Sequence, residues 1–181
     1  MADFCLETER IILRDWREED IPRFAAMCAD EEVMRHFPAT LSRTESDALV
    51  ERIKIHIAEH GFGLWALERS QDRAFLGFTG IQIVRFASPI KGDVEIGWRL
   101  DKTFWGNGYA REAAEASLQW FWAHTDYNRI VSMTIADNTP SWGLMRRIGL
   151  ERRPDLDFDH PNIEAGTRCC RQIVYAKERK I

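Results

Sequence analysis

The stretch "VEIGWRLDKTFWGNGYAREA" (residues 94–113) passes from a strand pattern to a helix pattern through two closely spaced glycines. Residues 92–100 alternate apolar and polar side chains, as a β-strand does. Beyond the glycines, apolar residues recur at helical spacing, namely Ala110, Ala114, Leu118 and Phe121. The free N–H groups at the start of a helix bind anions, so this junction predicts a phosphate-binding loop. On spacing alone, a tight turn that binds no ligand fits equally well.

Two common phosphate-binding motifs do not fit this loop. A Walker A loop needs a lysine and a hydroxyl residue after its last glycine, whereas the residues after Gly108 are tyrosine and alanine. The dinucleotide-binding fingerprint needs a third glycine within a βαβ unit. Here Gly106 and Gly108 supply half of that motif, and the strands expected at 61–69 and 74–86 predict an antiparallel hairpin. The sequence therefore excludes a Walker A loop and disfavours a dinucleotide site.

The rest of the chain predicts a mixture of helices and strands, without repeats or low-complexity linkers. Further strand patterns begin at residue 9 and cover 129–136 and 170–179. Helix patterns cover 21–29, the residues after the capping-box sequence "SRTE" at 42–45, and 138–150. Two helices thus precede the main sheet, and we expect one α+β domain over residues 1–181.

Composition and charge disfavour several classes of protein. The 181 residues include 45% hydrophobic and 30% charged side chains, the profile of a soluble globular protein. The net charge of −4 disfavours nucleic acid as a partner. The first residues show no signal-peptide pattern, no apolar run is long enough to span a membrane, and the cysteines show no metal-ligand spacing. We therefore expect a cytoplasmic protein that needs no metal, membrane or nucleic acid.

Two segments of the chain carry a family pattern. The loop "WGNGYA" (105–110) matches Q/R-x-x-G-x-G/A with Trp105 in the first place, and "NTPSWGLMRRIGL" (138–150) matches N-x-x-S…G-F/L. In this order, with the expected elements around them, the segments resemble the GNAT superfamily of acyl-CoA-dependent N-acetyltransferases. The resemblance is strongest to the RimJ/RimL-like branch, and it extends from about residue 7 to about residue 178.

The resemblance implies an α+β GNAT fold that binds acetyl-CoA. Such a fold has a mixed, mostly antiparallel central sheet of about six to seven strands flanked by about four helices. Its sheet is splayed between the fourth and fifth strands, here 93–100 and 129–136. The resemblance places the pantetheine arm in this splay, in contact with Trp98, Leu100, Asn138 and Ser141. It places the pyrophosphate, without a metal, on the loop residues Gly106, Asn107, Gly108, Tyr109 and Ala110, with Trp105 covering the cofactor or packing under the loop.

The implied reaction is direct attack of an amine on the acetyl thioester, which needs a base, an oxyanion donor and a proton for the thiolate. Glu95 is the candidate base, acting through water, although a solvated strand carboxylate fits the same position. A backbone N–H near Trp98 or Arg99 is the candidate oxyanion donor. Many family members carry a tyrosine seven residues after the asparagine, where this chain has Met145. In the RimL-like branch a serine at the position of Ser141 is a proposed acid, so the resemblance makes Ser141 the candidate acid here. The alternatives are that Ser141 is simply a contact to the cofactor or within the first helical turn, and that the CoA thiol is acidic enough to need no acid.

The acceptor is expected to be a primary amine, either a protein N-terminal α-amino group or a small amine. The family binds it with the early helices and the late loops, where His36 and His160 fall. A surface histidine and a fixed turn before proline explain these two residues more simply. We expect a monomer or a homodimer. Because the usual tyrosine is missing, a non-catalytic acyl-CoA-binding sensor is the alternative to an enzyme.

Overall fold

A mixed nine-stranded sheet forms the centre of the computed structural model, which describes residues 4–179. Its strands are β1 (Cys5–Glu7), β2 (Ile11–Arg14), β3 (Leu64–Arg69), β4 (Phe75–Ile83), β5 (Val94–Leu100), β6 (Arg129–Thr134), β7 (Glu151–Arg152), β8 (Phe158–Asp159) and β9 (Arg171–Glu178). Their order is β1-β2-β3-β4-β5-β6-β9-β7, and β8 pairs with β9. All neighbours are antiparallel except β5 and β6, which run parallel. Residues 1–3 and 180–181, which belong to the expected domain, lie outside the described residues.

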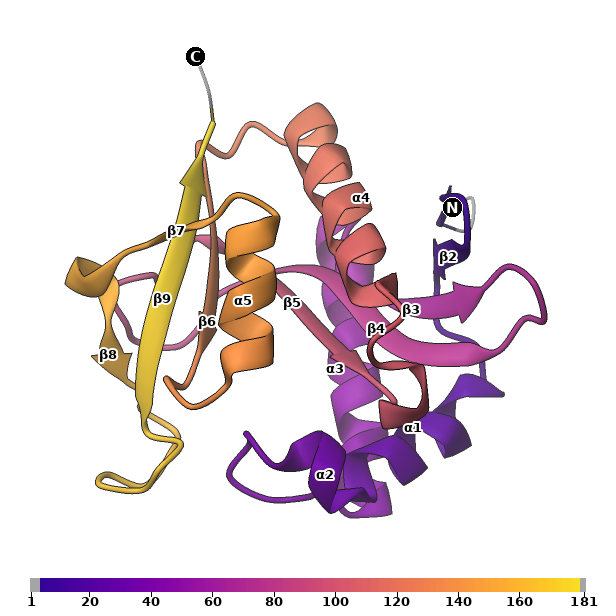
Figure 1. Cartoon of the computed structure of the whole chain (residues 1–181), viewed down its shortest axis with the longest axis horizontal. Helices are drawn as coiled ribbons and strands as arrows, with labels where there is room; N and C mark the ends of the chain where they lie inside the picture. The colour runs from indigo at the N-terminus through magenta and orange to yellow at the C-terminus, as the bar shows by residue number, and fades with distance from the viewer. Residues whose placement is uncertain (1–3, 180–181) are drawn as a thin grey trace.

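Five α-helices and two short 3₁₀ helices accompany the sheet within the same described residues. They are α1 (Asp20–Ala29), α2 (Glu31–Met34), α3 (Arg43–His60), α4 (Tyr109–His124), α5 (Thr139–Arg147), η1 (Lys102–Phe104) and η2 (Pro154–Leu156). Figure 1 shows α4 and α5 on the near side of the sheet and α3 behind it. The core divides accordingly: α4 and α5 pack with Trp65 and Ile96, whereas α1 and α3 pack with Phe75 and Phe78. Within residues 4–179, no helix is long and apolar enough to cross a membrane.

The local sequence explains where α3 begins and ends. At its start, the Ser42 hydroxyl accepts a hydrogen bond from the Glu45 N–H at 3.3 Å, and the Glu45 carboxylate accepts one from the Ser42 N–H at 2.8 Å. This reciprocal pair is the predicted capping box. At the other end, Gly61 adopts φ = 74°, the left-handed conformation that favours glycine. Between these ends, Val50 and Ile53 pack into the core.

The expected fold class is confirmed, because the sheet is mixed and mostly antiparallel and helices cover both of its faces. The parallel pair β5–β6 lies at the expected splay. The expected numbers of strands and helices are too low for the described residues. The additional strands β1, β7 and β8 have two or three residues each, and the additional helix α2 has four. Elements this short cannot show a periodic pattern in the sequence.

A buried ion-pair network fixes α1 against the sheet. The Arg14 guanidinium donates to both carboxylate oxygens of Asp20, at 2.7 and 2.9 Å, and to Glu68 at 2.7 Å. All three side chains are buried. Buried charges are tolerated when they are paired, so removal of Arg14 would leave Asp20 without a counter-charge, whereas Glu68 also pairs with Arg17 and Arg73. Cys28 of α1 contacts Arg99 of β5. The network therefore also holds α1 in place over β5.

Replacing Arg14 with leucine is expected to lower the free energy of unfolding by about 3–5 kcal/mol, because the buried Asp20 carboxylate loses its counter-charge and Glu68 loses one of its three arginine partners. Urea unfolding followed by circular dichroism measures this loss. The matched control is Arg43→Leu, which breaks an exposed i, i+4 pair with Asp47 and is expected to cost less than about 0.5 kcal/mol. A similar loss in both variants would contradict the structural role of the buried network.

Candidate active site

The strands β5 and β6 separate soon after they pair. β5 pairs with β4 along its whole length, from Val94 to Leu100. Its parallel pairing with β6 is confined to Val94–Ile130 and Glu95–Val131. Figure 1 shows the two strands diverging beyond this point, with α5 in front of β6. The second half of β5 therefore has one backbone edge that no strand of the described chain covers.

The backbone groups on this edge belong to even-numbered residues. In an antiparallel pair, alternate residues direct both their N–H and their C=O group to the same neighbour. The Asp93 carbonyl and the Asp101 N–H, which flank β5, both bond to the β4 side. Odd-numbered residues therefore face β4, and even-numbered residues such as Trp98 and Leu100 direct their backbone groups into the gap beside β6.

The loop after β5 presents a row of backbone N–H groups. Gly106 and Gly108 adopt φ angles of 77° and 82°, which residues with a Cβ disfavour. Gly108 is the N-cap of α4, and no side chain caps this end of the helix. The N–H groups from Gly106 to Ala110 have no acceptor within residues 4–179. Because the dipole of a 16-residue helix lies behind them, these groups fit the pyrophosphate of a nucleotide cofactor.

Side chains from two parts of the chain hold this loop in shape. The Asn107 amide donates to the carbonyls of Phe104 and Trp105, at 3.1 and 3.0 Å. Arg10, just before β2, donates to the Asn107 carbonyl at 3.1 Å and to the Glu112 carboxylate at 2.7 Å. Arg10 thus links the loop to the first turn of α4. The sequence analysis missed this residue, because nothing near Arg10 in the chain indicates such a distant contact.

The indole of Trp105 is fixed to the end of β5. Its N–H donates to the Leu100 carbonyl at 2.9 Å, and the Arg35 guanidinium lies 5.5 Å from the ring centre. The residue is 38% exposed, so part of the ring remains accessible. Since the Leu100 carbonyl is already used, the Leu100 N–H and the backbone groups of Trp98 are the ones left to bind a ligand.

The first turn of α5 follows the carboxyl end of β6. Asn138 is the N-cap: its side-chain oxygen accepts from the Ser141 N–H at 3.4 Å, and its amide donates to Thr134 Oγ1 at 2.9 Å. Ser141 is half-buried. Met145 lies one turn later on the same face and is fully buried in the core. Ser141 is therefore the hydroxyl group on the face of α5 where Met145 replaces the expected tyrosine.

Glu95 is buried at the point where β5 and β6 separate. The residue is 8% exposed, and its Oε2 accepts a hydrogen bond from Gln82 Nε2 at 2.9 Å. Burial raises the pKa of the Glu95 carboxyl to about 7. The alternative of a solvated strand carboxylate is therefore wrong. A carboxyl group that ionises near neutral pH has the property that a general base requires.

The two histidines singled out in the sequence have different surroundings. His36 Nε2 accepts from Arg35 Nε at 3.1 Å, while Nδ1 is buried and has no partner within residues 4–179. Burial and the charges of Arg35 and Arg168 lower the pKa of His36, so its ring is neutral at pH 7. His160 Nδ1 accepts from the Asn162 N–H at 3.2 Å. His160 thus belongs to a fixed turn, as its simpler explanation predicts.

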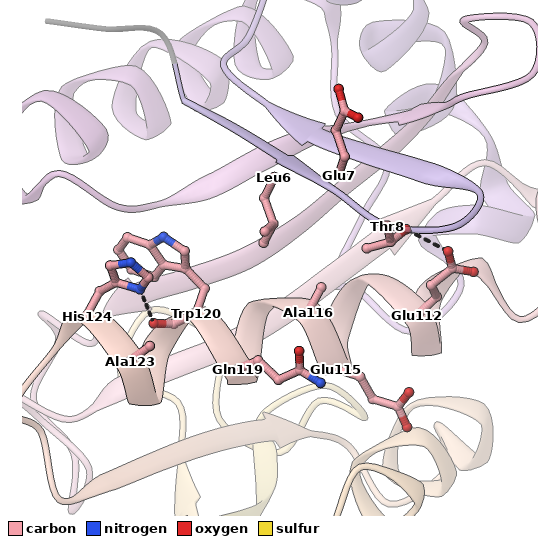
Figure 2. Close-up of a pocket in the computed structure, with 10 residues that line it drawn as sticks. All are labelled: Leu6, Glu7, Thr8, Glu112, Glu115, Ala116, Gln119, Trp120, Ala123 and His124. Carbon is pink, nitrogen blue, oxygen red and sulfur yellow. Dashed lines mark hydrogen bonds between the residues drawn. The ribbon is translucent and has the colours of Figure 1, made fainter.

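Two surface hollows lie along α4, outside the gap between β5 and β6. One, of about 530 Å³, lies between residues 6–8 and the outer face of α4, as Figure 2 shows. The other, of about 640 Å³, lies at the end of the same helix and shares Trp120 and His124 with the first. Neither is lined by Glu95, Ser141 or a residue of the glycine loop. No group of three or more His, Cys, Asp or Glu side chains among the described residues could hold a metal ion.

Comparison with known proteins identifies the family. The model of the acetyltransferase (GNAT) domain matches residues 10–151. The chain belongs to the GNAT acetyltransferase family. It is 26% identical over 148 residues to the uncharacterized N-acetyltransferase YnaD of Bacillus subtilis (strain 168), covering 81% of this chain and 82% of YnaD. This GNAT protein is therefore an acetyltransferase that depends on acetyl-CoA.

Solved structures of acetyltransferases share the GNAT fold of this chain. The acetyltransferase from Agrobacterium tumefaciens str. C58 has a TM-score of 0.80 at 21% identity, covering 99% of this chain and 96% of that chain. RimL, a ribosomal L7/L12 α-N-protein acetyltransferase solved in complex with coenzyme A, has a TM-score of 0.76 at 17% identity, covering 97% of this chain and 98% of that chain. The resemblance to a family with RimL-like members is thus confirmed at the level of the fold.

The GNAT fold arranges the predicted site residues along one path. Trp98 and Leu100 lie on the free edge of β5, and the glycine loop follows at its end. Ser141 lies on α5, on the β6 side of the gap, and Glu95 lies where the gap begins. The roles of these residues in binding and catalysis remain predictions. The sequence analysis missed Gln82, which hydrogen-bonds to Glu95, because cross-strand register is not visible in a single segment.

Gly106→Ala is expected to raise the Kd for acetyl-CoA about tenfold or more, because alanine resists the φ of 77° that presents the loop N–H groups. Isothermal titration calorimetry measures this change. The control is Gly61→Ala, since Gly61 has φ = 74° and, like Gly106, has no atom within 4 Å of an added Cβ. Both variants are expected to lose about 1 kcal/mol of stability. If both bind acetyl-CoA as the wild type does, the loop is not the pyrophosphate site.

Proposed function

We propose that this GNAT protein transfers the acetyl group of acetyl-CoA to a primary amine, either a protein N-terminal α-amino group or a small amine. The observation that carries the proposal is the buried Glu95 carboxyl, whose pKa is about 7 at the point where β5 and β6 separate. An ammonium group must lose a proton before its nitrogen can attack, and such a carboxyl suits that task. RimL, an α-N-protein acetyltransferase of the same fold, is the reason to include protein N-termini.

In the proposed arrangement the donor lies along the gap, and acetyl-CoA supplies the acetyl thioester. The N–H groups from Gly106 to Ala110 hold the pyrophosphate, because they have no other acceptor in the described chain. The backbone of Trp98 and the N–H of Leu100 bind the pantetheine arm from the free edge of β5. The Asn138 side chain, which bonds to the Ser141 N–H, holds the first turn of α5 on the opposite side.

The proposed chemistry is direct attack in a ternary complex. Glu95 takes a proton from the acceptor ammonium through a water molecule, and the neutral nitrogen then bonds to the carbonyl carbon. The Trp98 N–H, directed into the gap, stabilises the negative charge on the carbonyl oxygen. The nitrogen loses its second proton to water as the C–S bond breaks. Ser141 is the candidate donor of the proton that the leaving sulfur takes up, and it regains a proton from the water that took the second proton from the nitrogen.

An acceptor screen tests this proposal. The protein is incubated with acetyl-CoA and a panel of N-terminal peptides, amino acids, polyamines and amine-containing antibiotics. Release of the free thiol is followed, and mass spectrometry confirms the new amide. We expect turnover with at least one class of amine. Binding of acetyl-CoA without transfer to any amine of the panel would contradict the proposal and favour an acyl-CoA sensor.

Glu95→Gln is expected to lower kcat/KM at pH 8 by about 100-fold or more, because an amide cannot accept the proton. The ratio of wild-type to variant rates is expected to rise with pH up to about 7 and then to level off, as the Glu95 carboxyl ionises at a pKa of about 7. This ratio cancels the ionisation of the acceptor. Glu51→Gln, on the exposed face of α3, is the control and is expected to behave as wild type. A ratio that does not change with pH would dismiss Glu95 as the base.

The same variant is expected to be more stable than the wild type at neutral pH. The pKa of the Glu95 carboxyl is 4.5 in the unfolded chain and about 7 when buried, so wild-type stability falls as the pH rises between these values. Above pH 7 the wild type carries the whole free-energy cost of the buried, ionised carboxylate. Glutamine cannot ionise, so Glu95→Gln is expected to raise the free energy of unfolding by about 1–3 kcal/mol at pH 8 and by little at pH 4. Urea unfolding at both pH values measures the difference, and an equal effect at the two would contradict the raised pKa.

A further inference from the structure

Arg99 is half-buried, and no carboxylate in residues 4–179 forms an ion pair with it. Its Nε is buried without a hydrogen-bond partner, and its Nη1 donates to the Cys28 sulfur at 3.1 Å. Burial raises the pKa of the Cys28 thiol, so the sulfur is uncharged at neutral pH and does not neutralise the arginine. A partly buried charge without a counter-ion is unfavourable, and a bound anion would offset this penalty.

Three aromatic rings surround the guanidinium, and none of them accepts a hydrogen bond from its unpaired Nε. The guanidinium carbon lies 4.2 Å from the ring centre of Phe37, 5.5 Å from that of Phe78 and 6.0 Å from that of Phe24. Such contacts stabilise the charge through the ring faces, but they cannot accept hydrogen bonds in the plane of the group. Phe37 is 38% exposed, so the guanidinium lies close to the protein surface on the side of this ring. His36, the preceding residue, has a second buried and unpaired nitrogen, Nδ1.

Arg99 lies on the same face of β5 as Glu95, because side chains two and four residues apart along a strand share a face. On the opposite face, Val94 and Ile96 are buried in the core under α4 and α5. An acceptor therefore reaches the gap from the face of Glu95. Between the two charged residues lies Gly97, where an added Cβ would meet one atom within 4 Å, Cδ2 of Leu64 at 4.0 Å. No side chain of β5 therefore stands between the carboxylate and the guanidinium on this face.

We propose that Arg99 binds a carboxylate of the amine acceptor while the acceptor nitrogen lies at Glu95. This inference rests on the proposed acetyl transfer and specifies its acceptor as an anionic amine. Four strand residues span about 13 Å between the Cα atoms of Glu95 and Arg99, so the nitrogen and the carboxylate are several bonds apart. Two sources have this chemistry: a peptide with an acidic side chain near its N-terminus, and an elongated free amino acid.

The test compares acceptors that differ in one charge. Ser-Glu-Ala amide is paired with Ser-Gln-Ala amide, and linear ω-amino acids of increasing length are paired with their carboxamides. We expect the wild type to prefer the carboxylate in one of these pairs by about 10- to 100-fold in kcat/KM, mostly through KM. A preference in the peptide pair identifies the source as a polypeptide, and one in the other pair identifies a free amino acid. Equal kcat/KM values in both pairs would overturn the proposal.

Variants assign the preference to Arg99. In Arg99→Met the preference is expected to disappear, because kcat/KM for the carboxylate acceptor falls toward that for the uncharged one. Arg99→Lys keeps the charge and is expected to retain part of the preference. The control Arg52→Met removes an exposed arginine of α3 and is expected to retain all of it. A preference that persists in Arg99→Met would overturn the proposal. If that variant does not fold, a preference in Arg99→Lys as large as that of the wild type would overturn it instead.

If the proposed acetyl transfer is wrong, the carboxylate site of Arg99 can still be tested separately. In that case no amine is acetylated, and binding of the two peptides in the presence of CoA is measured instead by calorimetry. Tighter binding of Ser-Glu-Ala amide than of Ser-Gln-Ala amide, lost in Arg99→Met, would support the carboxylate site without acetyl transfer. Equal affinity of the wild type for the two peptides would overturn it.

Discussion

The two residue pairs that join β5 to β6, Val94–Ile130 and Glu95–Val131, determine the geometry of the site. A parallel strand that continued beside β5 would satisfy the backbone groups of Trp98 and Leu100. Because β6 turns away, those groups point into a gap, and a chain of a cofactor can take the place of the missing strand. The same divergence places the glycine loop at one end of the gap and the Glu95 carboxyl at the other.

Charged side chains that are shielded from water occur in this protein both with and without an ion-pair partner. Arg14, Asp20 and Glu68 form a matched set, and their hydrogen bonds hold α1 on the sheet. Glu95 is buried and Arg99 is half-buried, and neither forms an ion pair within residues 4–179. The pKa of each is shifted toward its neutral form, to about 7 for Glu95. Uncompensated charges lower stability, so they are expected where a substrate completes them. Both lie on one face of β5, the face to which we assign the acceptor.

The sequence predicted the features that depend on near neighbours in the chain. The capping box of Ser42 and Glu45 and the helix start at Gly108 involve residues within one turn, so their patterns are visible locally. The loop motif and the segment after Asn138 also sufficed to indicate the family. In contrast, β1, β7 and β8 are too short for a pattern and form only because a longer strand pairs with them. Arg10 could not be assigned to the loop, because its contacts lie about a hundred positions away.

By itself, the sequence determined the order of the main elements, the loop that suits a pyrophosphate and the absence of the usual tyrosine at Met145. Only the tertiary structure decided that Glu95 is buried with a pKa of about 7, and that Arg99 is enclosed by rings with no carboxylate beside it in the described chain. The reason is physical. The ionisation and the hydrogen bonding of a side chain depend on the groups around it in space, and here those groups come from α1, β4 and the turn after α2.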